Sequence, residues 1–231
     1  MGRKISGDRG QASSVLIIAV PALIAVALLI VTMLGDAFGK RADASVGADA
    51  AALAAANSWY SHVETEMTGF TGKGYAQQLI VLKNVLNVNA SGLVDKNTWL
   101  AKASALASAN GAEIVASSVT YSPQNKGLVF YIKTRSLTAA AGTSTRPVSE
   151  AYAVVQVTGG LCWYTPGVLG VKDGGTCRNL SQITSLLTPP PPPPPPKKVP
   201  GKPQPTPEPQ PPFKPDVSFS SFKANVRLVA S

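Results

Sequence analysis

A run of apolar and small residues without one charged side chain extends from residue 10 to residue 35. Its apolar core, residues 15–34, is about 20 residues long, and a helix of that length at 1.5 Å per residue matches the roughly 30 Å hydrocarbon core of a bilayer. The pattern predicts a transmembrane helix over residues 13–35, preceded by a lead of residues 1–12. Pro21 lies inside this span, where it removes one backbone donor and predicts a kink in the helix.

A cleavable signal peptide is the alternative interpretation of this segment, because signal peptides also begin with a basic lead. Their apolar region is typically about 7 to 15 residues long, which is shorter than the run seen here. The residues at positions 35–37, Gly-Asp-Ala, could nevertheless serve as a small-residue cleavage site.

The basic residues that flank the span predict its orientation. Arg3, Lys4 and Arg9 precede it, whereas Lys40 and Arg41 follow it. The excess on the amino side is small, and the positive-inside rule then favours a cytoplasmic amino terminus. We therefore expect a single-pass protein of the cell membrane with the rest of the chain exported.

Alanine and small polar residues follow the span, with no turn signal strong enough to end a helix. The pattern predicts that the helix continues as an alanine-rich helix over residues 36–66. Ala48, Ala52 and Ala55 lie four and three positions apart, so they share one helix face. Small side chains allow two helix backbones to approach closely. We expect this face to pack against another helix.

Three short motifs occur in order around the span. Asp8-Arg9-Gly10-Gln11 precedes it, Lys40-Arg41-Ala42-Asp43 follows it, and residues 48–56 read Ala-Asp-Ala-Ala-Ala-Leu-Ala-Ala-Ala. In this order the segment resembles the amino-terminal part of the TadE/TadG-like Flp (Tad) pilus-assembly proteins. The resemblance covers residues 8–56, about a fifth of the chain. It implies a bacterial, membrane-anchored component of a type IV-like pilus or secretion apparatus. Its partners would be other pilus-assembly subunits and membrane platform proteins.

One position departs from the pattern of prepilin-type substrates, which usually carry Glu at the fifth position after a Gly cut. A cut after Gly10 would place Val15 there. The resemblance therefore implies an accessory, minor pilin-like protein and not a major pilin.

The periodicity beyond the alanine tract predicts short helices and then strands. Glycines between residues 69 and 74 end the first helix, leucines recur at helical spacing over residues 75–88, and Asp95 is placed to cap a helix through Asn110. Apolar and polar residues then alternate in three runs separated by turn-rich loops, which predicts an antiparallel meander over residues 114–157. The fold class is therefore α+β, with an exported domain over residues 67–187.

The carboxyl-terminal part begins with a proline-rich linker, residues 188–215, which includes eight consecutive prolines. Eight prolines in polyproline II span about 25 Å, and such a segment cannot bury a core, so we expect it to be extended or disordered. Residues 216–231 follow, and alternation within them predicts a strand. The linker is long enough for this strand to return to the edge of the chain's own sheet. Addition to a partner's sheet is the alternative.

The two cysteines, Cys162 and Cys177, are flanked by glycine pairs. One pair in an exported domain predicts a disulfide, and closing such a loop stabilises a fold by about 3 kcal/mol on the chain-entropy model. Two free thiols or two metal ligands are the alternatives. His62 is the chain's one histidine, which argues against zinc.

The net charge of +9 raises the question of nucleic-acid binding. The basic residues are scattered and do not interleave with aromatic residues, so we expect no nucleic-acid partner; an exported basic tail fits anionic lipid or cell-wall polymer better.

The chain lacks phosphate-loop, nucleophile-elbow and zinc-protease motifs. Glu64 and Glu66 lie near His62, but that position is typical of a solvated helix face. We therefore expect neither catalysis nor a cofactor. A membrane-tethered module that binds cell wall or another ligand is the alternative to pilus assembly.

Overall fold

The computed structural model describes residues 9–68, 70, 73–187 and 221–229 of the chain. The proline-rich linker predicted over residues 188–215 lies outside these residues. The helices are α1 Arg9–Met67, α2 Tyr75–Leu86, the 3-10 helix η2 Ala90–Gly92, α3 Lys96–Ala109 and α4 Leu180–Leu187. The strands are β1 Ala112–Ser122, β2 Gly127–Ser136, β3 Val148–Gly159, β4 Leu161–Thr165, β5 Val168–Asp173, β6 Thr176–Arg178 and β7 Lys223–Val229.

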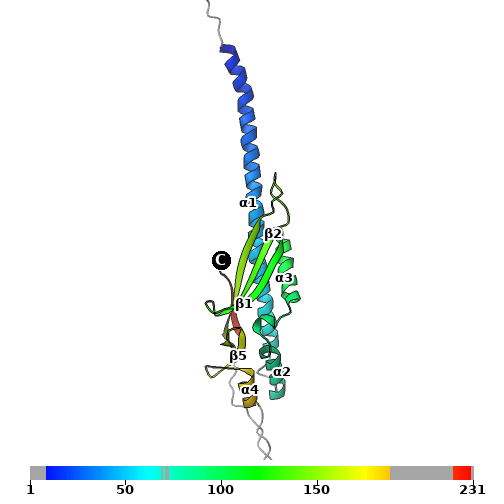
Figure 1. Ribbon diagram of the computed structural model, residues 1–231, viewed down its shortest axis with the longest axis vertical. Helices are drawn as coiled ribbons and strands as arrows, with labels where there is room; N and C mark the ends of the chain where they lie inside the picture. The colour runs from blue at the N-terminus through cyan, green and yellow to red at the C-terminus, as the bar shows by residue number, and fades with distance from the viewer. Residues whose placement is uncertain (1–8, 69, 71–72, 188–220, 230–231) are drawn as a thin grey trace, which may run out of the picture.

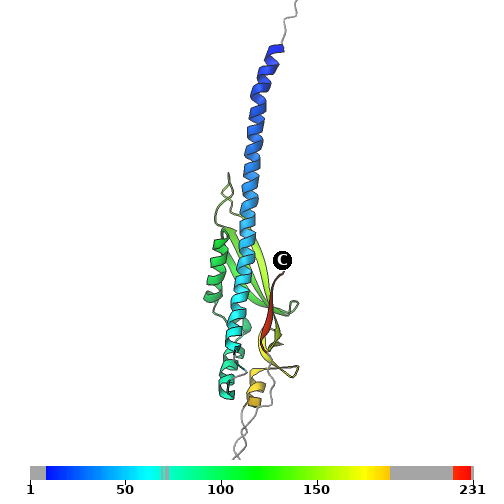
Figure 2. The same ribbon diagram turned by 180° about the vertical axis from the view of Figure 1, so that it is seen from behind.

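The helix α1 is 59 residues long and would extend about 90 Å at 1.5 Å per residue. It begins at Arg9, inside the predicted lead, and joins the apolar span to the alanine tract as expected. Figures 1 and 2 show it as one gently curved helix whose first half extends well beyond the rest of the protein. Pro21 lies inside it, and the chain is helical on both sides of that position. The kink at Pro21 stays a prediction.

The two halves of α1 have opposite environments. The most apolar stretch of its first half is entirely unburied, and this helix is long and apolar enough to cross a membrane. From Ala44 onward one face of the helix is fully buried. One helix therefore has two parts. Residues 19–35 form an exposed apolar rod, and the later residues form the central helix of a folded domain.

The alanine face of α1 packs inside its own chain. Ala48, Ala52 and Ala55 are 0% exposed, and α1 contacts α3, β2 and β3. These alanines lie in a core that α1 shares with α3 and the sheet, so this face is not left open for a partner. The core extends to Ile183, and this half of α1 is therefore part of the folded domain.

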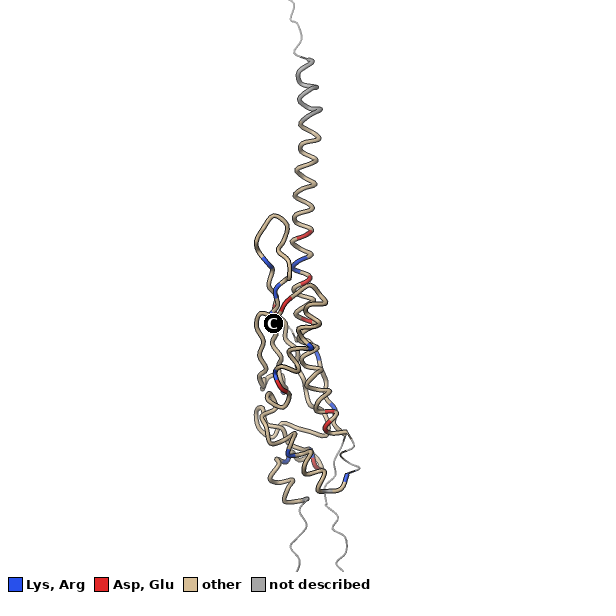
Figure 3. The backbone as a smooth tube through the Cα atoms, turned by 90° about the vertical axis from the view of Figure 1, so that its right-hand side faces the viewer, with Lys and Arg blue, Asp and Glu red and all other residues tan. Residues whose placement is uncertain are grey.

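The larger sheet has the strand order β1-β2-β3-β7, and every neighbouring pair is antiparallel. The meander expected over residues 114–157 is therefore confirmed. Leu128, Phe130 and Ile132 alternate along β2 and are fully buried. They face the layer formed by α1 and α3, which lies on one side of the sheet (Figure 3).

The strand β7 pairs with β3, so the carboxyl-terminal segment returns to the edge of the chain's own sheet. Val226 pairs with Val155 in this ladder. Phe222, just before β7, lies with its ring 5.6 Å from the ring of Tyr60 on α1. The strand predicted from the alternation and its return, favoured by the length of the linker, are both confirmed.

A second, three-stranded sheet of order β4-β5-β6 follows β3, and it was not expected from the sequence. Cys162 on β4 and Cys177 on β6 form the predicted disulfide, with 5.9 Å between their Cα atoms. The pair Gly174-Gly175 has positive φ angles of 52° and 93° and makes the tight turn between β5 and β6. With α2 and α4, this sheet forms the end of the domain farthest from the exposed half of α1 (Figure 1).

Candidate functional site

The first candidate surface is the exposed half of α1. Leu23 is 70% exposed, Val31 is 65% exposed, and Phe38, two positions past the first acidic residue after the span, is 71% exposed. Monomeric soluble proteins rarely present apolar surface of this extent. The exposed apolar surface of this half of α1 is therefore the first candidate for a contact with other molecules.

Polar contacts tie α1 to the domain where the apolar stretch ends. A carboxylate oxygen of Asp36 accepts a hydrogen bond from the backbone N–H of Ala141, at 2.6 Å. About two helical turns further on, the buried hydroxyl of Thr134 donates to the carbonyl of Ala44, also at 2.6 Å. Lys40 lies 3.7 Å from Asp43 in an exposed pair of the kind that contributes little to stability. The junction is therefore held by contacts to the backbone more than by ion pairs.

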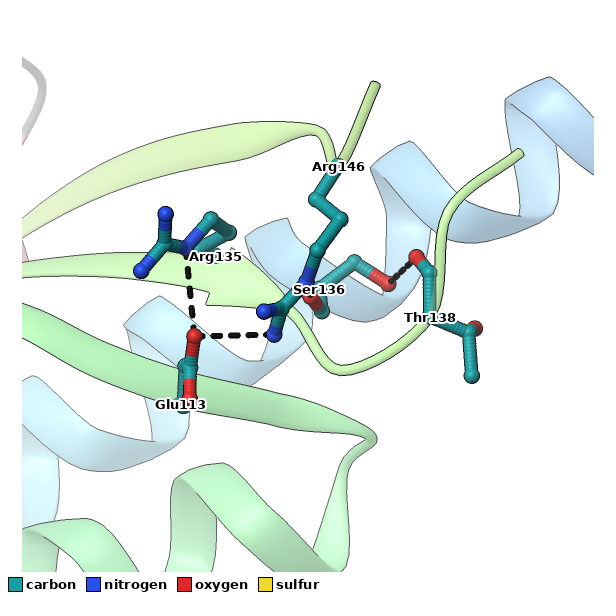
Figure 4. A network of polar contacts seen from close by, with 5 residues as sticks. All are labelled: Glu113, Arg135, Ser136, Thr138 and Arg146. Atoms are coloured by element: carbon teal, nitrogen blue, oxygen red, sulfur yellow. Dashed lines mark hydrogen bonds and ion pairs between the residues drawn. The ribbon is translucent and has the colours of Figure 1, made fainter. Parts of the chain in front are cut away.

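A network beside this junction orders the start and the end of the loop between β2 and β3 (Figure 4). One carboxylate oxygen of Glu113 lies 3.1 Å from Nε of Arg135 and 2.8 Å from a terminal nitrogen of Arg146. Nε of Arg146 also donates to the carbonyl of Ser136, whose hydroxyl donates to the carbonyl of Thr138. Two guanidinium groups share one carboxylate, so the network leaves one net positive charge at the end of the domain nearest the exposed rod.

The outer face of the larger sheet carries a separate pair. Nζ of Lys133 lies 2.8 Å from a carboxylate oxygen of Glu150. This hydrogen bond raises the pKa of Lys133 and lowers the pKa of Glu150. Beside it, the rings of Tyr131 and Tyr152 lie 5.1 Å apart, and burial together with the charge of Glu150 raises the pKa of Tyr131. These shifts favour the charged pair and a neutral phenol, which is the arrangement of a structural cross-strand contact.

The end of the domain opposite the rod has an open hollow of about 600 Å³ between α2, β5 and α4. Leu86, Leu169 and Leu180 line it together with Asn87 and Ser181. A hollow with apolar walls and a few polar groups can accept a small ligand.

The residues weighed for acid–base chemistry lie near the end of α1. The carboxylate of Glu64 accepts a hydrogen bond from the hydroxyl of Tyr60 at 2.8 Å, which raises the pKa of that phenol. His62 and Glu64 are both exposed on α1. In the part of the chain that the structure describes, no three His, Cys, Asp or Glu side chains are grouped to hold a metal ion.

The contact between Asp36 and the β2–β3 loop was missed from the sequence. The two residues are 105 positions apart, so no local pattern links them. Two features of the sequence could have indicated the contact. Asp36 is the first acidic residue after the apolar span, and residues 136–145 carry no charged side chain.

The fold and these surfaces define a class of protein in which an α+β domain is built around the second half of one helix and the first half is an exposed apolar rod. Comparisons with protein-family models, with curated proteins and with solved structures find no match to this chain.

Proposed function

We propose that this protein is a membrane-anchored accessory component, similar to a minor pilin, of a Tad or type IV-like pilus assembly or secretion system. It would act by protein–protein contacts: its rod packs laterally against other apolar helices in the membrane, and its domain makes contacts outside. The observation that carries this proposal is the continuity of α1, which links an exposed apolar half to a half buried in the domain. The motif order in residues 8–56 adds support.

The orientation proposed is a cytoplasmic amino terminus and an exported domain. The disulfide between Cys162 and Cys177 supports it, because disulfides persist in oxidising compartments and are rare in the cytosol. The basic lead before the span points the same way.

The continuity of α1 also gives the proposal a mechanism. Because the same helix continues into the core of the domain, a partner that grips the rod also fixes the position of the domain. A flexible tether between anchor and domain would not transmit that position. The rod is therefore suited to hold the exported domain at a defined place in an assembly.

Co-purification tests the proposal. The tagged protein should be recovered from solubilised membranes together with the platform protein and the secretion ATPase of the pilus system. A matched control replaces residues 13–35 by an unrelated apolar span of equal length, which keeps the membrane anchor and changes the packing surface. Recovery of these partners with the parent and their loss with the control supports helix packing. Failure to recover them with the parent overturns the proposal.

The hollow between α2, β5 and α4 favours a second candidate function, a membrane-tethered module that binds cell wall or another ligand. Replacing Ser181 by Trp would occupy part of this hollow. Loss of binding to isolated cell wall in this variant, with no pilus partner recovered by the parent, would select the second function.

A further inference from the structure

The loop between β2 and β3, residues 137–147, runs along α1 toward the apolar rod (Figure 1). At its base, the backbone N–H of Leu137 donates to the carbonyl of Gly111, which packs beside Asp43 of α1. At its tip, Gly142 lies against the methyl end of Met33. Met33 and Asp43 are ten residues apart on one helix, so the loop rises about 15 Å along it.

This rise brings the loop tip beside a residue of the apolar span itself. If the span lies in the bilayer, Met33 is near its outer boundary, because the whole apolar core of about 20 residues is needed to cross about 30 Å. The tip of the loop must then lie at the level of the lipid headgroups.

The chemistry of the loop fits that position. Residues 136–145 contain no charged side chain, and Figure 3 shows the tip of the loop free of Lys, Arg, Asp and Glu. The one charged residue within the loop, Arg146, is paired with Glu113. Phe38 is exposed on the neighbouring turn of α1 and adds apolar surface at this level.

Several backbone N–H groups of the loop donate hydrogen bonds within the protein, as a position near hydrocarbon requires. The N–H of Ala140 donates to the carbonyl of Thr145, and that of Thr143 donates to the carbonyl of Ala140. The N–H of Thr145 donates to the hydroxyl of Thr143, and that of Ala141 donates to Asp36. Near hydrocarbon, backbone groups must find such partners within the protein.

We propose that the β2–β3 loop is a second membrane contact of this protein and that its tip, residues 141–145, inserts into the headgroup region of the bilayer beside α1. The inference rests on the membrane anchoring in the proposed function. With two contacts, the rod and the loop, the domain is held against tilting relative to the bilayer. The loop then sets the tilt at which the domain meets its partners.

A fluorescent label tests this insertion in the full chain. Ser144→Cys places the label at the loop tip, Gln124→Cys places it in the β1–β2 turn at the other end of the sheet, and Leu23→Cys places it on the rod. All three positions are exposed, and the native cysteines are bonded to each other. Each labelled protein is reconstituted in vesicles of phosphatidylcholine and phosphatidylglycerol, with and without lipids that carry a nitroxide quencher near the headgroup.

The expected result is several-fold stronger quenching, and a blue-shifted emission, at Ser144 than at Gln124. Equal quenching at these two positions overturns the loop proposal. The label at Leu23, near the middle of the span, separates the two claims and is read with a second quencher carried in the middle of the bilayer. Quenching at Leu23 by this quencher, without headgroup quenching at Ser144, refutes only the loop contact. If a lipid quencher placed in the middle of the bilayer leaves Leu23 unquenched, the anchoring fails and the loop proposal fails with it.

Discussion

Gly47 lies where α1 crosses the start of the larger sheet, and a methyl group added there would meet the sheet directly. Its Cβ would lie 2.6 Å from Cβ of Ala112 and 3.6 Å from the carbonyl oxygen of Ala107 at the end of α3. Non-bonded carbon atoms normally pack at about 3.5 to 4.0 Å. The helix and β1 would therefore have to separate by about 1 Å, and overpacking of this kind typically costs about 1 to 3 kcal/mol.

Gly39 provides a matched control, because it lies in the same helix and an added Cβ would meet nothing within 4 Å. Both Gly47→Ala and Gly39→Ala gain the same helix propensity, about 1 kcal/mol in a helix interior. The difference between the two variants therefore isolates the steric clash. We expect Gly39→Ala to retain or increase the free energy of unfolding, and Gly47→Ala to fall below Gly39→Ala by about 1 to 3 kcal/mol.

The assay is urea unfolding of the full chain in a membrane mimetic, followed by tryptophan fluorescence. Trp59 and Trp99 are buried in the domain core and report on its unfolding. The double variant Gly47→Ala with Ala112→Gly removes the clashing methyl group and should recover part of the loss. If Gly47→Ala is as stable as Gly39→Ala, the alanine face of α1 does not pack on the sheet as described, and the argument for one shared helix fails.

Three further predictions follow from other contacts. Replacing Cys162 and Cys177 by Ser removes a bridge between residues 15 positions apart and should lower the free energy of unfolding by about 3 kcal/mol. A digest of the parent without reduction should contain the crosslinked peptides. Alkylation of both cysteines without reduction would refute the bond. Lys133→Met should raise the pKa of Glu150, measured by NMR titration. Because Lys133 lowers the pKa of Glu150, the pair stabilises the fold above the ordinary carboxyl value of 4.5, and this contribution is lost as pH falls. The stabilities of parent and variant should therefore converge at acid pH. A difference that stays constant across pH would contradict the assignment. Phe222→Ala removes the ring contact with Tyr60 of α1 and should lower the free energy of unfolding by up to about 3 kcal/mol. It should also expose the carboxyl-terminal segment to limited proteolysis. Unchanged protease resistance would show that the backbone ladder alone holds β7.

Much of the fold could be predicted because its signals are local. Asp95 accepts a hydrogen bond from the N–H of Asn97 and caps α3 as expected, and Gly111 ends the helix region with a φ of 70°. The alternation along β2 and β7 depends on burial of one sheet face, which strand periodicity records directly. These elements required no knowledge of distant contacts.

The elements that were missed depend on contacts between distant residues. The strands β4 to β6 are only three to six residues long, so they show little periodicity. Their place is fixed by the disulfide and by the ring of Trp163, which lies 4.9 Å from that of Tyr121 on β1. The alanine face of α1 presents a related problem. Small side chains predict close approach but do not identify the partner, and the structure places α3 and the sheet there.

The same limit applies to the candidate site. The apolar rod is evident from composition, whereas the contact between Asp36 and Ala141 joins segments 105 positions apart. Such a pairing follows from the path of the chain, because the β2–β3 loop begins where β2 ends beside α1.

The central claim is that α1 anchors an exported domain to the membrane, and one measurement tests it most directly. A reporter that is active only after export is fused after Ser231, and its activity is measured in membranes washed at alkaline pH. The account predicts an active reporter that remains with the washed membranes. Activity released into the supernatant, with a mature protein beginning near Phe38, would show that the apolar segment is a cleaved signal peptide. An inactive reporter in the membrane fraction would show that the domain faces the cytoplasm.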